Sequence, residues 1–165
     1  MDTIILSLLV DNTSGVLSRI AGLFSRRAYN IESLTVGTTA DPAYSRMTIV
    51  SKGDDLVLHQ LVEQLRKQED VRDVKVLEHD NSVVREEILV KVMADVKNRR
   101  DIIAIADIFR ANIIDVQKDS LIIELTGSQS KLSALIDMLS DYQILEIART
   151  GITGLSRGAE DVVFL

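Results

Sequence analysis

The chain contains one order of apolar segments twice, and this repeat restricts the folds it can adopt more than any other feature of the sequence. Stretches with alternating apolar side chains read as strands, and stretches with an apolar side chain every three or four residues read as amphipathic helices. In the first copy, strands are predicted over residues 4–10, 31–38, 44–51 and 71–77, with helices beginning after Gly15 and Asp55. The order of the first copy is therefore βαββαβ.

The same order begins again after a polar connector, residues 79–84. Its strands are predicted over 87–93, 113–117, 121–126 and 144–148, and its helices over 99–110 and 131–139. A split βαβ pattern with right-handed crossovers closes into a four-stranded antiparallel sheet with both helices on one face. We therefore expect an α+β chain of two tandem ferredoxin-like βαββαβ domains, the first at 1–78 and the second, with a tail, at 85–165.

Each predicted sheet leaves one face without helices. In the first copy that face would carry Ile5, Leu9, Ile31, Ser33 and Thr35, which as a group are too apolar to remain in water. A domain of about 80 residues also buries only a small core by itself. Pairing with a second molecule, either side by side or face to face, is therefore expected.

Composition excludes several classes of function. The net charge is −6 and the isoelectric point is about 4.9, whereas a nucleic-acid surface needs a surplus of lysine and arginine. The sequence has no cysteine, which excludes disulfides, thiolate metal sites and a cysteine nucleophile. No apolar run reaches the roughly 18 residues of a membrane span, and a strand pattern starts directly after Met1 and Asp2. We expect a cytoplasmic protein that contacts neither nucleic acid nor membrane.

Residues that could form a catalytic site do not occur at any familiar spacing. His59 falls within a predicted helix and His79 in the connector, and neither has a nucleophile or a paired carboxylate at a motif spacing. The acidic pair 54–55 begins a helix, where carboxylates complement the dipole, and the pair 86–87 opens a strand. No phosphate-binding loop, dinucleotide-binding motif or zinc-protease motif is present. We expect no catalytic residue and no metal ligand.

The turn from Asp11 to Gly15 is the strongest candidate for a binding site. It joins the first strand to the first helix, so free backbone N–H groups and the helix dipole would attract a carboxylate there. Gly15 would let a ligand approach the main chain, and the amide of Asn12 offers a donor and an acceptor for a free amino acid. The alternative is an ordinary helix cap, a role that Asp, Asn, Thr and Ser all favour. Asn30 also has an alternative role, as a left-handed residue that ends the helix.

Several segments of the sequence together resemble one protein family. The segments are residues 11–19, 29–36, 45–49, 109–110, 113–116, 149–151 and 154–158. The first two read DNTSGVLSR and YNIESLTV. In this order they resemble the small regulatory subunit of acetolactate synthase, also called acetohydroxyacid synthase, whose first domain is an ACT domain. The resemblance covers essentially the whole chain.

The resemblance implies a non-catalytic partner of a separate large subunit, which condenses pyruvate with a second 2-oxo acid. Thiamine diphosphate, a divalent metal such as Mg²⁺ and FAD would belong to that large subunit, and this chain would hold no cofactor. In the family, the small subunit raises the activity of the large one. It also makes the enzyme sensitive to feedback inhibition by valine or another branched-chain amino acid, and so regulates the synthesis of valine, isoleucine and leucine.

The resemblance further implies a homodimer with effector-binding residues at its interface. Asn12 and Gly15 of one protomer would hold the amino acid, and Asn30 and Ile31 would line the pocket across a two-fold interface. Val16 would contact the branched side chain.

Two features depart from the family pattern. Ala28 stands before the Tyr-Asn-Ile run, where glycine is common, which would reshape the end of the first helix and alter effector affinity. The tail over 160–165 is acidic and then apolar, which fits either a frayed end or an added contact for a partner. Two other functions stay open: a free-standing amino-acid sensor that regulates another enzyme or a transcription factor, and a small ferredoxin-like enzyme.

Overall fold

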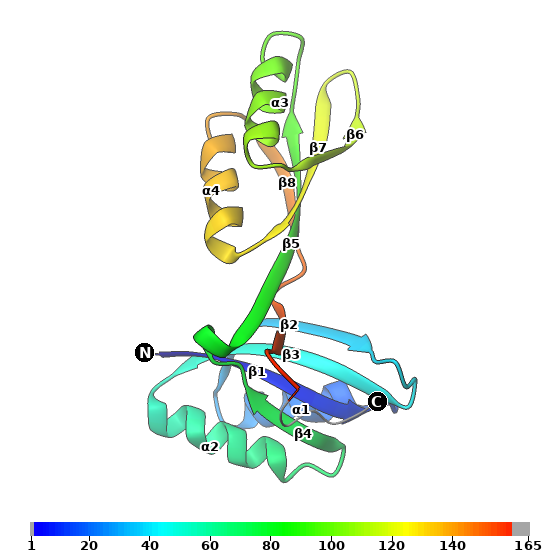
Figure 1. Cartoon of the computed structure of the whole chain (residues 1–165), viewed down its shortest axis with the longest axis vertical. Coiled ribbons are helices and arrows are strands. Elements are labelled where there is room, and N and C mark those ends of the chain that lie inside the picture. Colours follow the sequence, from blue (N-terminus) through cyan, green and yellow to red (C-terminus); the bar gives the residue numbers. More distant parts are fainter. Residues whose placement is uncertain (1, 160–165) are drawn as a thin grey trace. The chain divides into compact units, whose positions relative to one another are not determined.

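The computed structural model describes residues 2–159, which form two compact units (Figure 1). The first unit comprises residues 2–84 together with 152–159, and the second comprises residues 85–151. In each unit, two helices pack on one face of an antiparallel sheet. Both units therefore have the two-layer α+β architecture that the repeat predicts.

The first unit is built on a four-stranded sheet with the strand order β2-β3-β1-β4. Apolar side chains from alternate positions of β1, such as Leu6 and Leu8, are fully buried against Ile20 and Phe24 of the first helix. The elements are β1 (Asp2–Asp11), α1 (Val16–Arg26), β2 (Asn30–Thr38), β3 (Tyr44–Gly53), α2 (Asp55–Arg66) and β4 (Val71–Val76).

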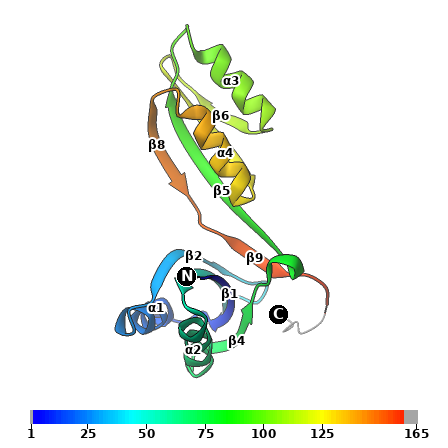
Figure 2. The same ribbon diagram turned by 90° about the vertical axis from the view of Figure 1, so that its left-hand side faces the viewer.

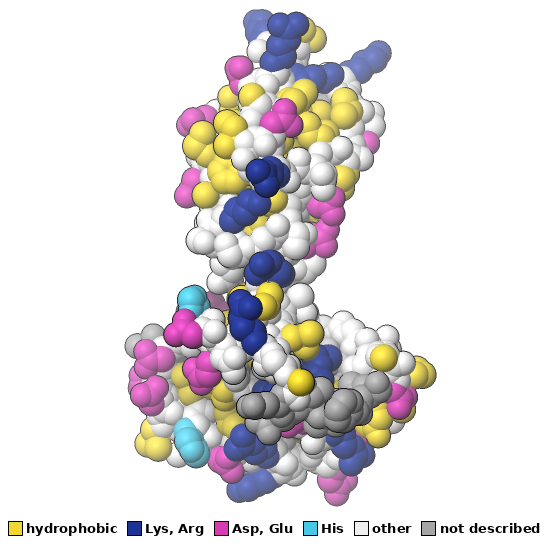
Figure 3. Space-filling model, in the orientation of Figure 1, with side chains coloured by type: hydrophobic (Ala, Val, Ile, Leu, Met, Phe, Trp, Pro, Cys, Tyr) yellow, Lys and Arg dark blue, Asp and Glu magenta, His cyan; other side chains and the backbone are white. Residues whose placement is uncertain are grey.

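The second unit repeats this topology with the strand order β6-β7-β5-β8. A short 3-10 turn, η1 (His79–Asn81), leads into it. Its elements are β5 (Ser82–Met93), α3 (Arg99–Ile108), β6 (Asn112–Val116), β7 (Ser120–Gly127), α4 (Gln129–Leu139) and β8 (Ile144–Arg149). Hydrophobic side chains reach the surface of this unit between charged ones (Figure 3), and Leu89, on the helix-free face of its sheet, is 37% exposed. The prediction of tandem ferredoxin-like domains is confirmed.

One strand has no counterpart among the predicted elements: β9 (Thr153–Ser156), which pairs with β5. A Cβ built on Gly154 would lie 2.7 Å from Cγ1 of Val84, at the start of β5, and 2.9 Å from Cδ1 of Leu77. The residue before β9 is also tied to the first sheet, since the hydroxyl of Thr35 donates to the carbonyl oxygen of Ile152 (3.1 Å). At position 154, where β9 approaches Val84 and Leu77 most closely, only glycine fits without a shift of its neighbours.

The position of β9 changes the domain boundary. Residues 152–159 lie with the first unit, where the backbone N–H of Arg157 also donates to the carbonyl oxygen of Asn81 (2.9 Å). The expected second domain, 85–165, includes this segment, because a short strand with little periodicity gives no local sign of which sheet it joins. The tail at 160–165 falls outside the described residues.

The helix-free face of the first sheet is covered by the chain itself. Leu9 is 1% exposed and Val50 is 5% exposed, although neither faces a helix. Figure 2 shows β9 on the side of this sheet away from α1 and α2. Ile152, just before β9, is itself 4% exposed. This face therefore needs no second molecule to cover it, which removes the reason for face-to-face pairing through it.

A bulge in β2 changes which side chains face the helices. The register between β2 and β3 shifts between Ile31 and Ser33, leaving Glu32 as the extra residue. As a result, Ile31 and Leu34 both pack against the core beneath the helices. The prediction that Ile31 lies on the helix-free face is wrong, because strict alternation does not allow for an extra residue. Thr35, beyond the bulge, does lie on that face.

Helix α1 ends in a Schellman motif in which Ala28 adopts a left-handed conformation, with φ 54°. The N–H of Tyr29 donates to the carbonyl oxygen of Phe24 (3.0 Å), and that of Ala28 donates to Ser25 (3.3 Å). The rings of Phe24 and Tyr29 meet edge to face with centroids 6.2 Å apart. The absence of glycine therefore does not reshape this helix end, because Ala28 accepts the conformation that glycine favours. Arg110, with φ 56°, repeats the motif after α3.

Replacing Ala28 with glycine is expected to stabilise the first unit. A left-handed conformation strains a residue that carries a Cβ, and this gain outweighs the greater entropy of glycine in the unfolded chain, for a net increase on the order of 0.5–1 kcal/mol. The free energy of unfolding from urea titration measures the change. Ala21→Gly, in the middle of the same helix, is the control and should lose about 1 kcal/mol. Loss of stability in both variants would contradict the strain argument.

Candidate functional site

The loop between β1 and α1 is held by hydrogen bonds to two neighbouring turns. The backbone N–H of Asp11 donates to the carbonyl oxygen of Asp70 (2.9 Å), and that of Asn12 donates to Ala43 (2.7 Å). The side-chain nitrogen of Asn12 donates to the carbonyl oxygen of Pro42 (2.8 Å). Asn12 therefore uses its amide nitrogen to fix the loop and presents its side-chain oxygen as an acceptor.

Two ion pairs connect the end of β1 and helix α1 to β4 and to the turn before it. Nε and Nη2 of Arg72 both donate to the carboxylate of Asp11, and Nε of Arg19 donates to Oδ2 of Asp70 (2.6 Å). The hydrogen bonds from Arg72 hold the pKa of Asp11 below its ordinary range. The Asp11 carboxylate is thus charged and engaged with Arg72, away from the start of the helix.

Helix α1 begins without a side-chain cap. Gly15 is the N-cap residue, with φ 86°, and the first intrahelical hydrogen bond runs from the N–H of Arg19 to its carbonyl oxygen (2.9 Å). In the described part of the chain, no side chain of residues 11–14 accepts a hydrogen bond from the N–H groups of residues 16–18. The interpretation of this turn as an ordinary side-chain cap is therefore wrong. Its free N–H groups and the helix dipole create a positive potential.

The space beside Gly15 is occupied by Arg19. A Cβ built on Gly15 would lie 2.8 Å from Nη1 of Arg19, which is closer than non-bonded atoms approach. The positive φ therefore favours glycine at this position whether or not a ligand approaches, and an added Cβ would also force the flexible guanidinium of Arg19 to shift. The guanidinium reaches back to the start of its own helix, where a cation opposes the dipole.

Val16 is enclosed by the core of the first unit. Its side chain is 3% exposed and packs with the buried residues between the sheet and the helices. At this turn, Val16 can offer a ligand only its backbone N–H. Its side chain is buried, so in this structure it is not placed to make the expected contact with a ligand. The neighbouring Leu17 is 46% exposed and is the apolar side chain of the first turn that reaches the surface.

The other two predicted site residues lie at the far end of α1. This helix has 11 residues, which correspond to a length of about 16 Å between the regions of Gly15 and Asn30. Asn30 begins β2 rather than ending the helix in a left-handed conformation, so that alternative is wrong. Its side-chain nitrogen donates to Glu32 (2.5 Å), and Ile31 after it is partly buried. One chain therefore holds Asn12 and Gly15 together but keeps Asn30 and Ile31 apart from them.

The histidines lie outside this site. His59 is exposed on α2, and Nδ1 of His79 lies 3.1 Å from a carboxylate oxygen of Asp80 at a fully exposed position. Within residues 2–159, His, Cys, Asp and Glu side chains do not gather in any group of three that could hold a metal ion. No helix in that same range has the length and apolar character needed to cross a membrane.

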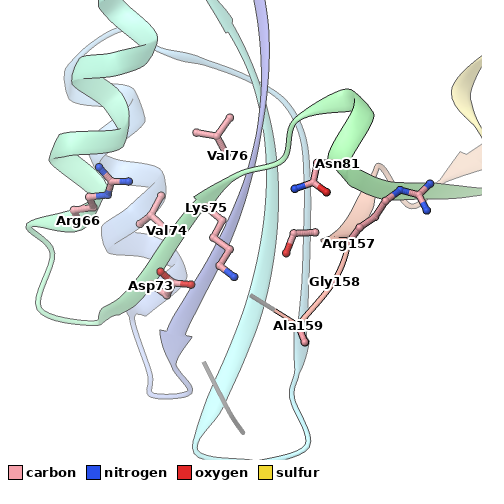
Figure 4. Close-up of a pocket in the computed structure, with 10 residues that line it drawn as sticks. Arg66, Asp73, Val74, Lys75, Val76, Asn81, Arg157, Gly158 and Ala159 are labelled. Atoms are coloured by element: carbon pink, nitrogen blue, oxygen red, sulfur yellow. The ribbon is translucent and has the colours of Figure 1, made fainter. Parts of the chain in front are cut away.

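A separate hollow of about 850 Å³ lies on the first unit, between β4 and the segment after β9 (Figure 4). Its lining includes Asp73 and Lys75 from β4, Asn81 from η1, and Arg157. None of the five predicted site residues is among the described residues that line it. It is therefore a different place on the unit from the β1–α1 loop.

Sequence reasoning does not single out Arg19, Asp70 or Arg72. Arg19 reads as one of several outward-facing polar residues of a helix, and Asp70 is 51 positions away from it. Only the antiparallel pairing of β1 with β4 brings the two together. One local signal was available: an arginine in the first turn of a helix, where the dipole favours acidic residues.

Two family models match the chain. One, described as the ACT domain of acetohydroxyacid synthase small-subunit-like proteins, matches residues 6–73. The other, described as the small subunit of acetolactate synthase, matches residues 85–158. Together they cover most of both units.

Curated relatives and a solved structure agree with these models. The chain is 50% identical over 154 residues to a probable acetolactate synthase small subunit of Archaeoglobus fulgidus, covering 93% of this chain and 96% of the relative. It is 48% identical over 155 residues to the acetolactate synthase isozyme 3 small subunit of Salmonella typhimurium, covering 93% and 95%. The crystal structure of the acetolactate synthase small subunit from Thermotoga maritima aligns with a TM-score of 0.90 at 40% identity, covering 96% and 99%. The chain belongs to the family of acetolactate synthase small subunits, and its first unit is an ACT domain.

Proposed function

We propose that this chain is a non-catalytic regulatory subunit that activates an acetolactate synthase large subunit and makes it sensitive to inhibition by valine. Membership of the small-subunit family supports the large subunit as partner and branched-chain amino acid synthesis as the pathway. The observation that carries the effector part is the first turn of α1, whose N–H groups have no side-chain cap. Asn12, in the loop that leads into this turn, uses its side-chain nitrogen to hold the loop and keeps its side-chain oxygen as an acceptor.

We place the reaction itself in the large subunit. Thiamine diphosphate, Mg²⁺ and FAD would be bound there, and would supply the chemistry that joins pyruvate to a second 2-oxo acid. The residues of this chain would bind the effector and contact the large subunit.

We further propose a side-by-side homodimer formed through β2. This strand is at an edge of the first sheet, and Val36 on it is 47% exposed. An unpaired strand edge is a template for another strand, so antiparallel pairing with the β2 of a second copy would continue the sheet. The cover provided by β9 favours this edge over the face of the sheet.

Such pairing would bring the separated halves of the site together. β2 runs from Asn30 to Thr38, so a two-fold axis at its centre would set the partner subunit's Asn30 opposite Thr38. The turn that follows Thr38 contacts Asn12 through Pro42 and Ala43. The start of the partner's β2 would therefore lie beside the β1–α1 loop, as the effector site requires.

The resulting pocket would match the chemistry of a branched-chain amino acid. The carboxylate would accept hydrogen bonds from the free N–H groups of the first turn, which include that of Val16 and follow Gly15. The ammonium group would donate to the side-chain oxygen of Asn12, and to the side-chain oxygen of the partner subunit's Asn30. The branched side chain would lie between Leu17 and the partner subunit's Ile31.

Regulation then requires that valine bind two arrangements of the holoenzyme with different affinity. Allosteric coupling of this kind typically amounts to about 1–3 kcal/mol. A few charge-assisted hydrogen bonds, made fully in one dimer geometry and incompletely in another, can supply that difference.

Acetolactate formation from pyruvate tests the proposal, measured with this chain alone, with the cognate large subunit alone, and with both together. We expect no activity from this chain alone, and a higher rate from the mixture than from the large subunit alone. Valine should inhibit the mixture, with leucine and isoleucine run in parallel to rank the effectors. A chain that binds valine by calorimetry but leaves the large subunit unaffected would indicate a free-standing sensor, and activity without the large subunit would contradict the proposal.

A further inference from the structure

We infer that Arg19 recognises the carboxylate of the effector, acting together with the N–H groups at the start of α1. This inference rests on the proposed effector site and adds to it a residue that sets specificity for the ionised carboxylate. The carboxylate pocket would then be formed by the guanidinium of Arg19 together with the N-terminal end of helix α1.

The first step of the argument is the position of the guanidinium. Nη1 of Arg19 lies against Gly15, 2.8 Å from the place where a Cβ would stand. Gly15 is the N-cap residue, so this edge of the guanidinium borders the uncapped first turn. A carboxylate bound to the N–H groups of that turn would lie next to Nη1.

The second step is the hydrogen-bonding capacity of Arg19. Among the described residues, Arg19 donates to Asp70 through Nε alone, at 2.6 Å. Its side chain is 51% exposed, and neither terminal nitrogen donates a hydrogen bond to a described residue. A guanidinium can bind carboxylates along more than one edge. The edge formed by Nη1 and Nη2 is therefore able to accept an effector while Nε keeps its contact with Asp70.

The third step is electrostatic. The start of a helix carries a positive partial charge, so a guanidinium folded back onto it is unfavourable unless an anion lies nearby. Asp70 supplies one carboxylate on the Nε side, and no carboxylate among residues 2–159 bonds to the Nη side that borders Gly15. A bound carboxylate there would balance both the dipole and the guanidinium.

The simpler role for Arg19 is a brace that fixes the loop through Asp70. Asp11, at the start of the loop, already has two other attachments nearby: its backbone bond to Asp70 and its bidentate pair with Arg72 of β4. These contacts hold the loop without Arg19. The two roles predict different results when each partner of the Arg19–Asp70 pair is changed in turn.

Calorimetric titration of the full chain with valine and with valinamide, which lacks the carboxylate, separates the roles. In Arg19→Gln we expect the Kd for valine to rise about tenfold to a hundredfold, as for loss of a hydrogen bond to a charged group. The preference for valine over valinamide should fall by a similar factor. Asp70→Asn is the matched control and should bind valine as tightly as the natural chain or more tightly, because it removes a competing carboxylate.

Several outcomes would overturn the inference. Equal weakening in Arg19→Gln and Asp70→Asn would show that the pair is only a brace, and an unchanged preference over valinamide would show that Arg19 does not read the carboxylate. Arg19→Lys, which keeps the charge but loses the planar fork, covers the case in which the glutamine variant fails to fold, and should bind valine with intermediate affinity. If the natural chain binds no branched-chain amino acid, the proposed effector site fails first. If it binds valine and Arg19→Gln binds it equally well, only this inference fails.

Discussion

Gly15→Asp is expected to abolish valine binding and leave a folded chain. The new carboxylate would stand at the start of α1, next to the free N–H groups and the guanidinium of Arg19, which are the groups proposed to hold the effector. It would therefore occupy the carboxylate pocket as a permanent internal anion. The collision of the new Cβ with Nη1 can be relieved, because that atom is at the end of a long side chain.

The expected size of the effect is large. Loss of the hydrogen bonds to one carboxylate, together with repulsion between two like charges, should raise the Kd for valine more than about a hundredfold. Calorimetry of the variant measures binding, and the mixture with the large subunit measures inhibition at rising valine concentration. Retention of full valine sensitivity would show that the effector binds elsewhere.

A matched control separates the site from general effects of the substitution. Gly158 also has a positive φ, 78°, but a Cβ there would meet nothing within 4 Å. Gly158→Asp thus introduces the same side chain, the same charge and a comparable backbone strain beside the hollow near β4, which holds none of the predicted site residues. It should bind valine normally. If both variants lose binding, the cause is the added charge or strain and not the pocket.

The fold could be predicted because its signals are local. Alternation along β1, and the apolar stripe of α1, directly give strands and helices whose order implies the ferredoxin-like topology. The strand β9 could not be predicted, because its place depends on a close fit between Gly154 and Val84 that no local pattern encodes. The bulge at Glu32, which turns Ile31 to the helix side, depends in the same way on pairing with another strand.

The candidate site was predictable only where its residues are close together in the sequence. Asn12 and Gly15 stand in one turn, and the sequence shows both at the start of a helix. The state of that turn was not visible, since contacts such as that of Asp11 with Arg72, which decide what each polar side chain of the turn bonds to, come from a distant strand. The role proposed for Arg19 depends on its bond to Asp70, 51 positions away, and on the place of its guanidinium beside Gly15.

The second large effect concerns an ion pair inside the second unit. Glu86 is 5% exposed, and its carboxylate accepts two hydrogen bonds from Arg149, from Nε (3.0 Å) and Nη2 (3.1 Å). The pair joins the start of β5 to the end of β8, close to the point where the chain leaves this unit. It therefore closes the sheet at the boundary of the unit.

Arg149→Met is expected to destabilise the second unit by about 3 kcal/mol, because it leaves a buried carboxylate without its donors. Hydrogen exchange followed by mass spectrometry can measure the two units separately, and protection should fall across residues 85–151 and remain in β1–β4. Lys91→Met, which removes an exposed pair with Glu146 (2.7 Å), is the control and should change stability by less than about 1 kcal/mol. Replacing both members, in Glu86→Leu with Arg149→Met, should recover much of the loss, since neither charge is then left buried and unpaired. If the single and double variants are equally unstable, the loss comes from packing around Arg149 and not from the unpaired carboxylate.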